Sequence, residues 1–287
     1  MNRFTSTLTK FASLVLVLIA VLGFSQNQNS LLWKVSGNGL KNPSYVFGTY
    51  HMLCSKDFRI KDKVKNALNS SEQFMMEVNF SDPETMSVMQ SAMMAKQKLS
   101  DVLSPKEVEM MKANISKFGY RFEDVEGMSP MVINSLLMVK YFDCAPTELK
   151  MIDVELMNLA ASGDKIIGGL ETAKEQMETL GKFLTPSDLV KTVSKFEEGK
   201  EMMVKLKKAY LDEDLASLDV LMKDRKEMTQ EQEDLLLNNR NKNWVKMMPE
   251  LMTDNSTFFA VGAGHLLGKE GVITLLQKQG YTVTPVN

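Results

Sequence analysis

The chain has 287 residues, of which 44% are hydrophobic and 24% are charged, within the usual range of folded globular proteins. Its 34 Lys and Arg against 36 Asp and Glu give a formal net charge of -2. That balance argues against a nucleic-acid-binding protein, which needs a basic face. Two cysteines are too few for a disulfide-rich scaffold or a cysteine-rich zinc module.

Residues 1–25 have the pattern of a signal peptide. Arg3 lies near the N-terminus, and Lys10 directly precedes an apolar run that ends at Phe24. The run has about 14 residues, fewer than the ~20 needed to span a membrane and typical of a secretory signal. Polar residues from Ser25 onward predict cleavage near that point, with an uncleaved anchor as the alternative. We therefore expect an exported bacterial protein, periplasmic or secreted, with no stable membrane span after cleavage.

An oxidising compartment would allow Cys54 and Cys144 to form a disulfide. The alternative is that one or both are buried thiols, because the sequence does not measure the distance between them. The disulfide is the favoured interpretation.

The first elements of the mature chain are strands and one helix. Residues 31–35 and 44–47 are apolar runs on either side of a segment rich in Gly, Asn and Pro, which predicts a β-hairpin. Residues 61–70 have a helical pattern. Residues 73–80 alternate as a strand, with turn residues after them.

The middle of the chain is largely helical. Asp82 followed by Pro83 predicts a helix N-terminus, and Thr172 with Glu175 forms a capping-box pattern. One short apolar run, residues 165–170, reads as a buried strand. The predicted helices cover residues 83–99, 104–118, 130–142, 147–162 and most of 172–252.

The end of the chain returns to alternating strands and helices. Residues 256–261 and 281–286 read as strands on either side of a helix. No Pro- or Ser-rich linker divides the chain, so residues 26–287 are expected to form a single domain. The predicted fold class is α/β: a central mixed or parallel β-sheet with flanking helices and a large helical insertion, a cap over about residues 83–252.

The chain has only two histidines, and each ends a Gly-x-x-His tetrapeptide directly after a predicted strand. The tetrapeptides run from Gly48 to His51 and from Gly262 to His265. The carboxyl ends of strands line the ligand crevice of an open α/β sheet, and glycine permits a tight turn and close backbone approach there. A shared metal or general-base site is therefore predicted, with neither imidazole packed in the core. The alternative is that each histidine is an ordinary hydrogen-bonded turn residue.

Glu77 lies on the predicted strand of residues 73–80. A central parallel strand is covered on both faces, so a glutamate there needs a cation, a metal or a proton. Glu77 is therefore a candidate metal ligand or general base. On a peripheral strand it would instead face solvent.

Arg240 and Asn241 fall on the apolar stripe of a predicted helix around residues 233–252, one turn before Trp244. An inward arginine needs a carboxylate or a bound anion, whereas one at the edge of the stripe extends to solvent. Both residues are candidate catalytic residues. Asp153 and Glu171 are weaker candidates, because stabilisation of a helix N-terminus explains Glu171.

These motifs resemble the TraB/GumN family, to which the animal Tiki metalloproteases are related. The resemblance covers nearly all of the mature chain. It rests on residues 45–51, 74–77, 169–172 with Gln176, 240–244 and 261–265. It implies an active site with paired Gly-x-x-His motifs and a strand glutamate, here His51, His265 and Glu77, and more loosely Arg240 and Asn241. For Tiki-like members it implies a divalent-metal peptidase activity.

The predicted function is an exported metal-dependent hydrolase that acts on a peptide or protein. His51, His265 and Glu77 would bind a divalent metal ion, with Mn, Co or Zn as candidates, or Glu77 would be the general base. Arg240 and Asn241 would hold a substrate carboxylate or a developing oxyanion. The alternative is a non-catalytic periplasmic protein that binds a ligand or haem, or signals, through the same crevice, as the related haem-binding ChaN-like proteins suggest.

Overall fold

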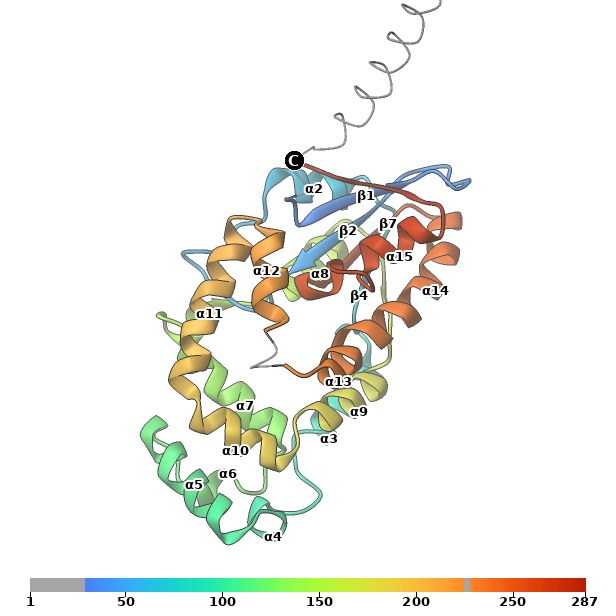
Figure 1. The fold of residues 1–287 in the computed structure, drawn as a ribbon. Helices are drawn as coiled ribbons and strands as arrows, with labels where there is room; N and C mark the ends of the chain where they lie inside the picture. Colours follow the sequence, from blue (N-terminus) through green and yellow to red (C-terminus); the bar gives the residue numbers. More distant parts are fainter. Residues whose placement is uncertain (1–28, 225–227) are drawn as a thin grey trace, which may run out of the picture.

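A six-stranded mixed β-sheet lies at the centre of the fold (Figure 1), in a computed structural model that describes residues 29–224 and 228–287. The sheet order is β6-β4-β7-β2-β1-β8. Its strands are β1 (Leu32–Ser36), β2 (Ser44–Thr49), β4 (Gln73–Met76), β6 (Ile166–Gly169), β7 (Thr257–Gly262) and β8 (Thr282–Pro285). The strands β6, β4, β7 and β2 are parallel, and β1 is antiparallel to β2 and β8. The predicted α/β class with a mixed sheet is confirmed.

The predicted signal peptide of residues 1–25 lies outside the described residues. Within the described ranges, no helix is both long enough and apolar enough to cross a membrane.

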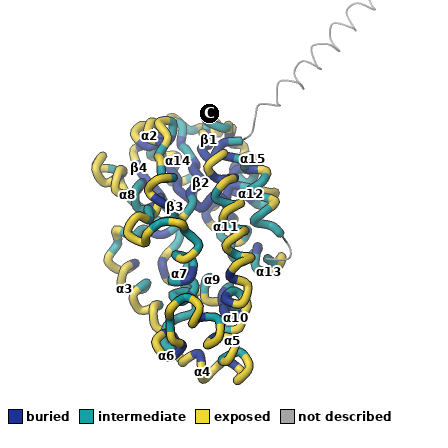
Figure 2. The backbone as a smooth tube through the Cα atoms, turned by 90° about the vertical axis from the view of Figure 1, so that its left-hand side faces the viewer, coloured by how far each residue is buried: buried dark blue, intermediate teal, exposed yellow. Residues whose placement is uncertain are grey.

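Helices cover both faces of the sheet. In Figure 2, α2 (Asp62–Asn69) and α8 (Ile152–Ser162) lie on one side, and α12 (Leu215–Met222) and α15 (Val272–Lys278) lie on the other. The central strand β7 is therefore buried on both faces, and its residues 258–261 are 0% exposed. A continuous apolar run is the usual pattern of a parallel strand between two helical layers.

The predicted hairpin is confirmed, but two other strand predictions need correction. The strand predicted over residues 73–80 ends at Met76, because the backbone carbonyl of Glu77 turns to accept the N–H groups of Leu170 and Glu171. The strand predicted over residues 165–170 was expected to be buried, but β6 is an edge strand and its first residue, Ile166, is 59% exposed.

A second apolar core holds a group of helices below the sheet in Figure 1. It contains Met111, Ile115, Ile133 and Leu189, each no more than 1% exposed. Its helices are α4 (Leu99–Val102), α5 (Pro105–Ile115), α6 (Phe122–Val125), α7 (Pro130–Met138) and α10 (Pro186–Ser194). The segment predicted as a cap, residues 83–252, is interrupted where α8 and β6 return to the sheet.

The remaining helices connect the cap to the sheet. They are α3 (Pro83–Ser91), α9 (Ala173–Phe183), α11 (Phe196–Leu211), α13 (Gln230–Glu233) and α14 (Asn239–Asp254). Asp82 caps α3 by accepting the N–H groups of Glu84 and Thr85, as predicted. The capping box of Thr172 and Glu175 also forms, at the start of α9.

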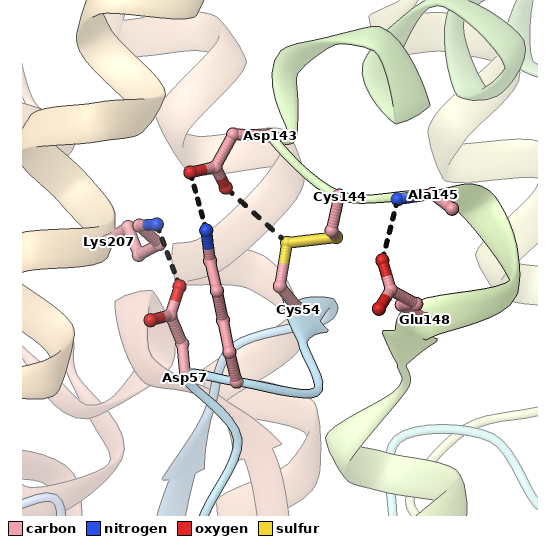
Figure 3. Close-up of a disulfide and its surroundings, with 8 residues drawn as sticks. Cys54, Asp57, Asp143, Cys144, Ala145, Glu148 and Lys207 are labelled. Atoms are coloured by element: carbon pink, nitrogen blue, oxygen red, sulfur yellow. Dashed lines mark hydrogen bonds and ion pairs between the residues drawn. A yellow bond between two sulfur atoms is a disulfide. The ribbon is translucent and has the colours of Figure 1, made fainter.

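Cys54 and Cys144 are joined by a disulfide, with their Cα atoms 6.0 Å apart (Figure 3). Cys54 ends the short strand β3 (Leu53–Cys54), which pairs antiparallel with β5 (Leu149–Lys150). Lys56 and Asp143 form an ion pair at 2.7 Å, and Asp143 also lies 3.6 Å from Cys54 Sγ. The segment that follows His51 is thereby attached to the segment that leads into α8.

Candidate metal site at the carboxyl edge of the sheet

Four neighbouring parallel strands lead to polar side chains at one edge of the sheet. In sheet order, β6 leads to Glu171, β4 to Glu77, β7 to His265 and β2 to His51. Parallel strands end on the same side, and that edge is where open α/β sheets bind ligands. The structure therefore brings the two histidines and Glu77 to one edge, although the histidines lie near opposite ends of the sequence.

The two imidazoles and Glu77 are arranged around Gly262. A β-carbon on Gly262 would lie 3.3 Å from Glu77 Oε1, 3.6 Å from His265 Cδ2 and 4.0 Å from His51 Cε1. His265 Cδ2 and His51 Cε1 must therefore be closer to each other than the sum of their distances from this β-carbon. Gly262 has an ordinary φ of -52°. Close approach, rather than a turn that only glycine can form, explains the glycine at this position.

Gly48, in the other Gly-x-x-His motif, also lies against neighbouring atoms. A β-carbon there would be 2.7 Å from Leu266 Cδ1 and 3.0 Å from Ala263 Cα. We expect Gly48→Ala to lower the free energy of unfolding by about 1 to 3 kcal/mol, the usual cost of overpacking, as measured by urea denaturation. Gly181→Ala is the matched control, because it lies within α9 with open space around it, and it should stabilise by up to ~1 kcal/mol. Equal effects of the two substitutions would contradict the close approach.

His265 is buried and neutral. It is 4% exposed, with Nδ1 2.6 Å from Asn241 Oδ1 and Nε2 3.0 Å from Arg240 Nη1. Arginine only donates hydrogen bonds, so Nε2 accepts, and Nδ1 carries the proton and donates a hydrogen bond to Asn241 Oδ1. Burial, together with the Arg240 charge, lowers the pKa of His265 to about 3, against the opposing influence of Glu77. The ring packs 4.4 Å from Trp244, so the expectation that neither imidazole packs in the core is wrong for His265.

Glu77 is held as a carboxylate beside His265. Its Oε1 accepts the Gly262 N–H at 2.8 Å and lies 3.6 Å from His265 Nε2, while Oε2 accepts from Arg240 Nη2 at 2.6 Å. Burial alone would raise the pKa of Glu77, but neighbouring positive charge, of Arg240 and His51, together with the Gly262 N–H, holds this pKa well below its usual range. The side chain is 13% exposed, so the solvent-facing alternative is wrong.

Arg240 connects the two carboxylates to His265. It follows a π-helical turn, Asp234–Asn238, a feature often found at functional sites. It donates to Glu171 from Nε and Nη2, to Glu77 from Nη2, and to the Leu236 carbonyl and His265 from Nη1. All five N–H groups of the guanidinium are thus used. Arg240 has no free donor for a substrate carboxylate or an oxyanion in this arrangement, which differs from its predicted role.

His51 has a different environment from His265. Its side chain is 72% exposed, and its Nδ1 lies 3.6 Å from Asp153 Oδ2. Asp153 Oδ1 accepts the Thr49 hydroxyl at 2.8 Å. The Asp153 carboxylate raises the pKa of His51 to about 9. The two histidines occupy equivalent places in the topology, but burial lowers the pKa of His265 and a neighbouring carboxylate raises the pKa of His51.

The side chains of His51, His265 and Glu77 are chemically suitable ligands for a divalent metal, but only those of His265 and Glu77 lie close together. The neutral Nε2 of His265 lies 3.6 Å from the ionised Glu77, and imidazole with carboxylate is a common ligand set for such metals. Among the described residues, no set of three donors that includes a histidine has its ligand atoms within 4.8 Å of one another. The set that does meet this limit includes the disulfide-bonded Cys54, which has no thiolate to offer. His51 thus stands apart from the other two predicted ligands.

Asp153 and Glu171, which the sequence made only weak candidates, both touch the site residues. Glu171 pairs with Arg240 at 2.6 Å, and Gln176 donates to both Glu171 and Glu77. A signal for Glu171 was present, because it follows a predicted strand as the two histidines do. Asp153 lies in the first turn of α8, and no local pattern links it to His51.

A cleft of about 740 Å³ opens beside Arg240 and Glu171, between α3, α9 and α14. Carboxylates outnumber cations in its lining, which includes Asp82, Glu84, Glu171, Glu175 and Glu178 against Lys174, Lys182 and Arg240. A cleft of this size is within the range of ligand-binding pockets.

Comparison with known proteins identifies the family. The model of the TraB/PrgY/gumN family matches residues 31–285. The chain belongs to this family. The resemblance inferred from the motifs is confirmed.

Animal relatives of this chain are named metalloproteases. Metalloprotease TIKI2 of Xenopus tropicalis is 24% identical over 90% of the chain, and metalloprotease TIKI1 of Homo sapiens is 25% identical over 89%. The metalloprotease TIKI homolog of Nematostella vectensis is 24% identical over 90% of the chain. The matches span 60%, 61% and 67% of these three relatives. No solved structure matches the chain significantly.

Proposed function

We propose that the protein is an exported metal-dependent peptidase with its active site at the carboxyl edge of the sheet. The observation that carries the proposal is the buried pair of His265 and Glu77, a neutral imidazole nitrogen 3.6 Å from an ionised carboxylate. The second histidine, His51, lies at the same edge. The naming of the TIKI relatives as metalloproteases supports the same class. Export rests on the predicted signal peptide, and the disulfide is consistent with it.

His51, His265 and Glu77 would hold a divalent metal ion, which supplies Lewis-acid polarisation of a carbonyl and a lowered pKa of bound water. Asn241 holds the proton of His265 on Nδ1, so that Nε2 carries the lone pair, which accepts from Arg240 at 3.0 Å and would bind the metal in place of that hydrogen bond. Glu77 is available in its charged form as a ligand or general base. Glu171 binds Arg240 through two nitrogens and limits where the guanidinium can lie.

The cleft beside Arg240 would receive the substrate. It is bounded by α3 and α9, and it reaches Glu171 and Trp244 at the edge of the sheet. Its excess of carboxylates favours a peptide segment with basic side chains, through the complementarity of opposite charges.

The test is a combined metal and cleavage assay on the purified mature protein. Bound metal is measured by elemental analysis, and cleavage of a peptide library is followed with and without a chelator. A chelator should abolish cleavage, and added metal should restore it. Glu77→Gln should lower turnover by about 100-fold or more, since it removes the charge at constant size. His51→Ala should abolish cleavage with little effect on folding, because its side chain is 72% exposed.

Glu72→Gln is the matched control. Glu72 precedes β4 at its amino end and accepts the Ser256 N–H at 2.8 Å, so it lies at the opposite end of the strand that leads to Glu77. This variant should keep full activity. Cleavage that is insensitive to chelator would overturn the metal-dependent mechanism, and binding of peptide or haem without turnover would favour the non-catalytic alternative.

A further inference from the structure

The imidazole of His51 faces a buried carboxylate that the proposed function does not use. Asp153 is 8% exposed, and its Oδ2 lies 3.6 Å from His51 Nδ1. Its other oxygen accepts the hydroxyl of Thr49 at 2.8 Å. Thr49 belongs to the same Gly-x-x-His motif, so the segment that presents the imidazole also fixes the carboxylate beside it.

His265 has an equivalent partner on the same ring nitrogen. Asn241 Oδ1 lies 2.6 Å from His265 Nδ1, and Asn241 Nδ2 donates to the Glu270 carbonyl at 2.9 Å, which fixes the oxygen toward the ring. In both histidines an oxygen acceptor therefore faces Nδ1, so Nε2 is the nitrogen that would bind a ligand; at His265 this nitrogen accepts from Arg240 Nη1 at 3.0 Å, and a metal ion would replace that hydrogen bond. Metal-binding histidines usually have such a partner on the nitrogen that does not bind the metal.

The orientation of the His51 ring agrees with this arrangement. Its Cε1 atom, which lies between the two ring nitrogens, faces Gly262, where a β-carbon would be 4.0 Å away. Gly262 is also the residue that borders Glu77 and His265. Since Nδ1 is turned to Asp153, Nε2 is the nitrogen that remains for a metal at this edge.

Several links hold the helix of Asp153 against the loop of His51. The disulfide joins Cys54 to Cys144, and β3 pairs with β5. The Ser55 N–H also donates to the Glu148 carbonyl at 2.8 Å. Each link joins the segment just after His51 to the segment just before α8. Together they restrict movement of Asp153 relative to the imidazole.

We propose that Asp153 is the positioning residue of His51: it holds the Nδ1 proton and presents Nε2 to the metal, as Asn241 does for His265. The proposal rests on the proposed function, because it gives His51 the role of a metal ligand. It adds a residue outside the paired motifs to the machinery of the site.

The test uses Co²⁺ as the probe, because bound Co²⁺ has a visible absorption spectrum that depends on its ligands. Asp153→Ala should weaken Co²⁺ binding by about 10- to 100-fold, the usual effect of removing such a partner. Asp153→Asn keeps an oxygen acceptor and should recover most of the affinity. Glu155→Gln is the matched control, since Glu155 lies in the same first turn of α8 and pairs with Lys150 at 3.0 Å; it should leave the affinity unchanged.

A second measurement separates this proposal from the proposed function. In ¹⁵N spectra of the metal-free protein the two histidines give two sets of ring signals, and Asp153→Ala should shift those of His51 only. Unchanged signals from the buried His265 would show that the variant folds. If the wild-type protein binds no Co²⁺, the proposed function fails. The shift of the His51 signals in Asp153→Ala still tests whether Asp153 positions the His51 ring. If the wild type and Asp153→Ala bind Co²⁺ equally well, or if the His51 signals do not move, the positioning role is overturned.

Discussion

Arg240→Met should lower the free energy of unfolding by about 3 to 5 kcal/mol, the cost of leaving buried charges without a partner. The side chains of Glu77 and Glu171 are only 13% and 9% exposed, and Arg240 contacts each at 2.6 Å. Methionine fills much of the same volume but carries no charge. The two carboxylates would then lie close together without a counter-charge. Urea unfolding followed by circular dichroism measures the loss.

Two further variants make this prediction specific. Lys242→Met removes a cation from the same helix, but Lys242 is 49% exposed in its pair with Glu270, so the loss should be below about 1 kcal/mol. Adding Glu171→Gln to Arg240→Met removes one of the unpaired charges and should restore part of the stability. An Arg240→Met protein as stable as the wild type would contradict the charge network.

The edge position of the site could be predicted from the sequence. His51 and His265 each follow a short apolar run, and the ends of parallel strands share one edge of a sheet. Glu77 lies within the predicted strand of residues 73–80, and its position at the edge follows from the end of β4 at Met76. The apolar stripe that contains Trp244 also favours an inward Arg240, with a position at the edge of the stripe as the alternative. These predictions depend on local patterns, and such patterns are present in a single sequence.

The contacts between elements could not be predicted in the same way. Asp153 meets His51, and Glu171 meets Arg240, only because α8 and α14 dock against the sheet. The two Gly-x-x-His motifs look alike, yet His265 follows the central strand and packs against Trp244, whereas the side chain of His51 is 72% exposed. Packing between distant segments therefore decides the environment and the direction of the pKa shift of each histidine.

Replacing both Cys54 and Cys144 with serine should lower the free energy of unfolding by about 4 to 5 kcal/mol in the chain-entropy treatment of loop closure. The two residues are 90 positions apart, so the disulfide restricts a long segment of the unfolded chain. Urea denaturation should also give a larger m-value for the variant, because its unfolded state exposes more surface. Reductant should destabilise the wild type and leave the variant unaffected. Thiol labelling of the wild type without reductant, or equal stability of the two proteins, would contradict this prediction.

Loss of the disulfide should affect the site less than it affects stability. The pairing of β3 with β5 and the ion pair of Lys56 with Asp143 at 2.7 Å still join the same two segments in the folded protein. Thr49 also still donates to Asp153 at 2.8 Å, so the carboxylate remains beside His51. The double serine variant should therefore bind Co²⁺ more tightly than Asp153→Ala, although it is expected to be much less stable than the wild type. The opposite order would mean that the disulfide, rather than the local hydrogen bond, sets the position of Asp153.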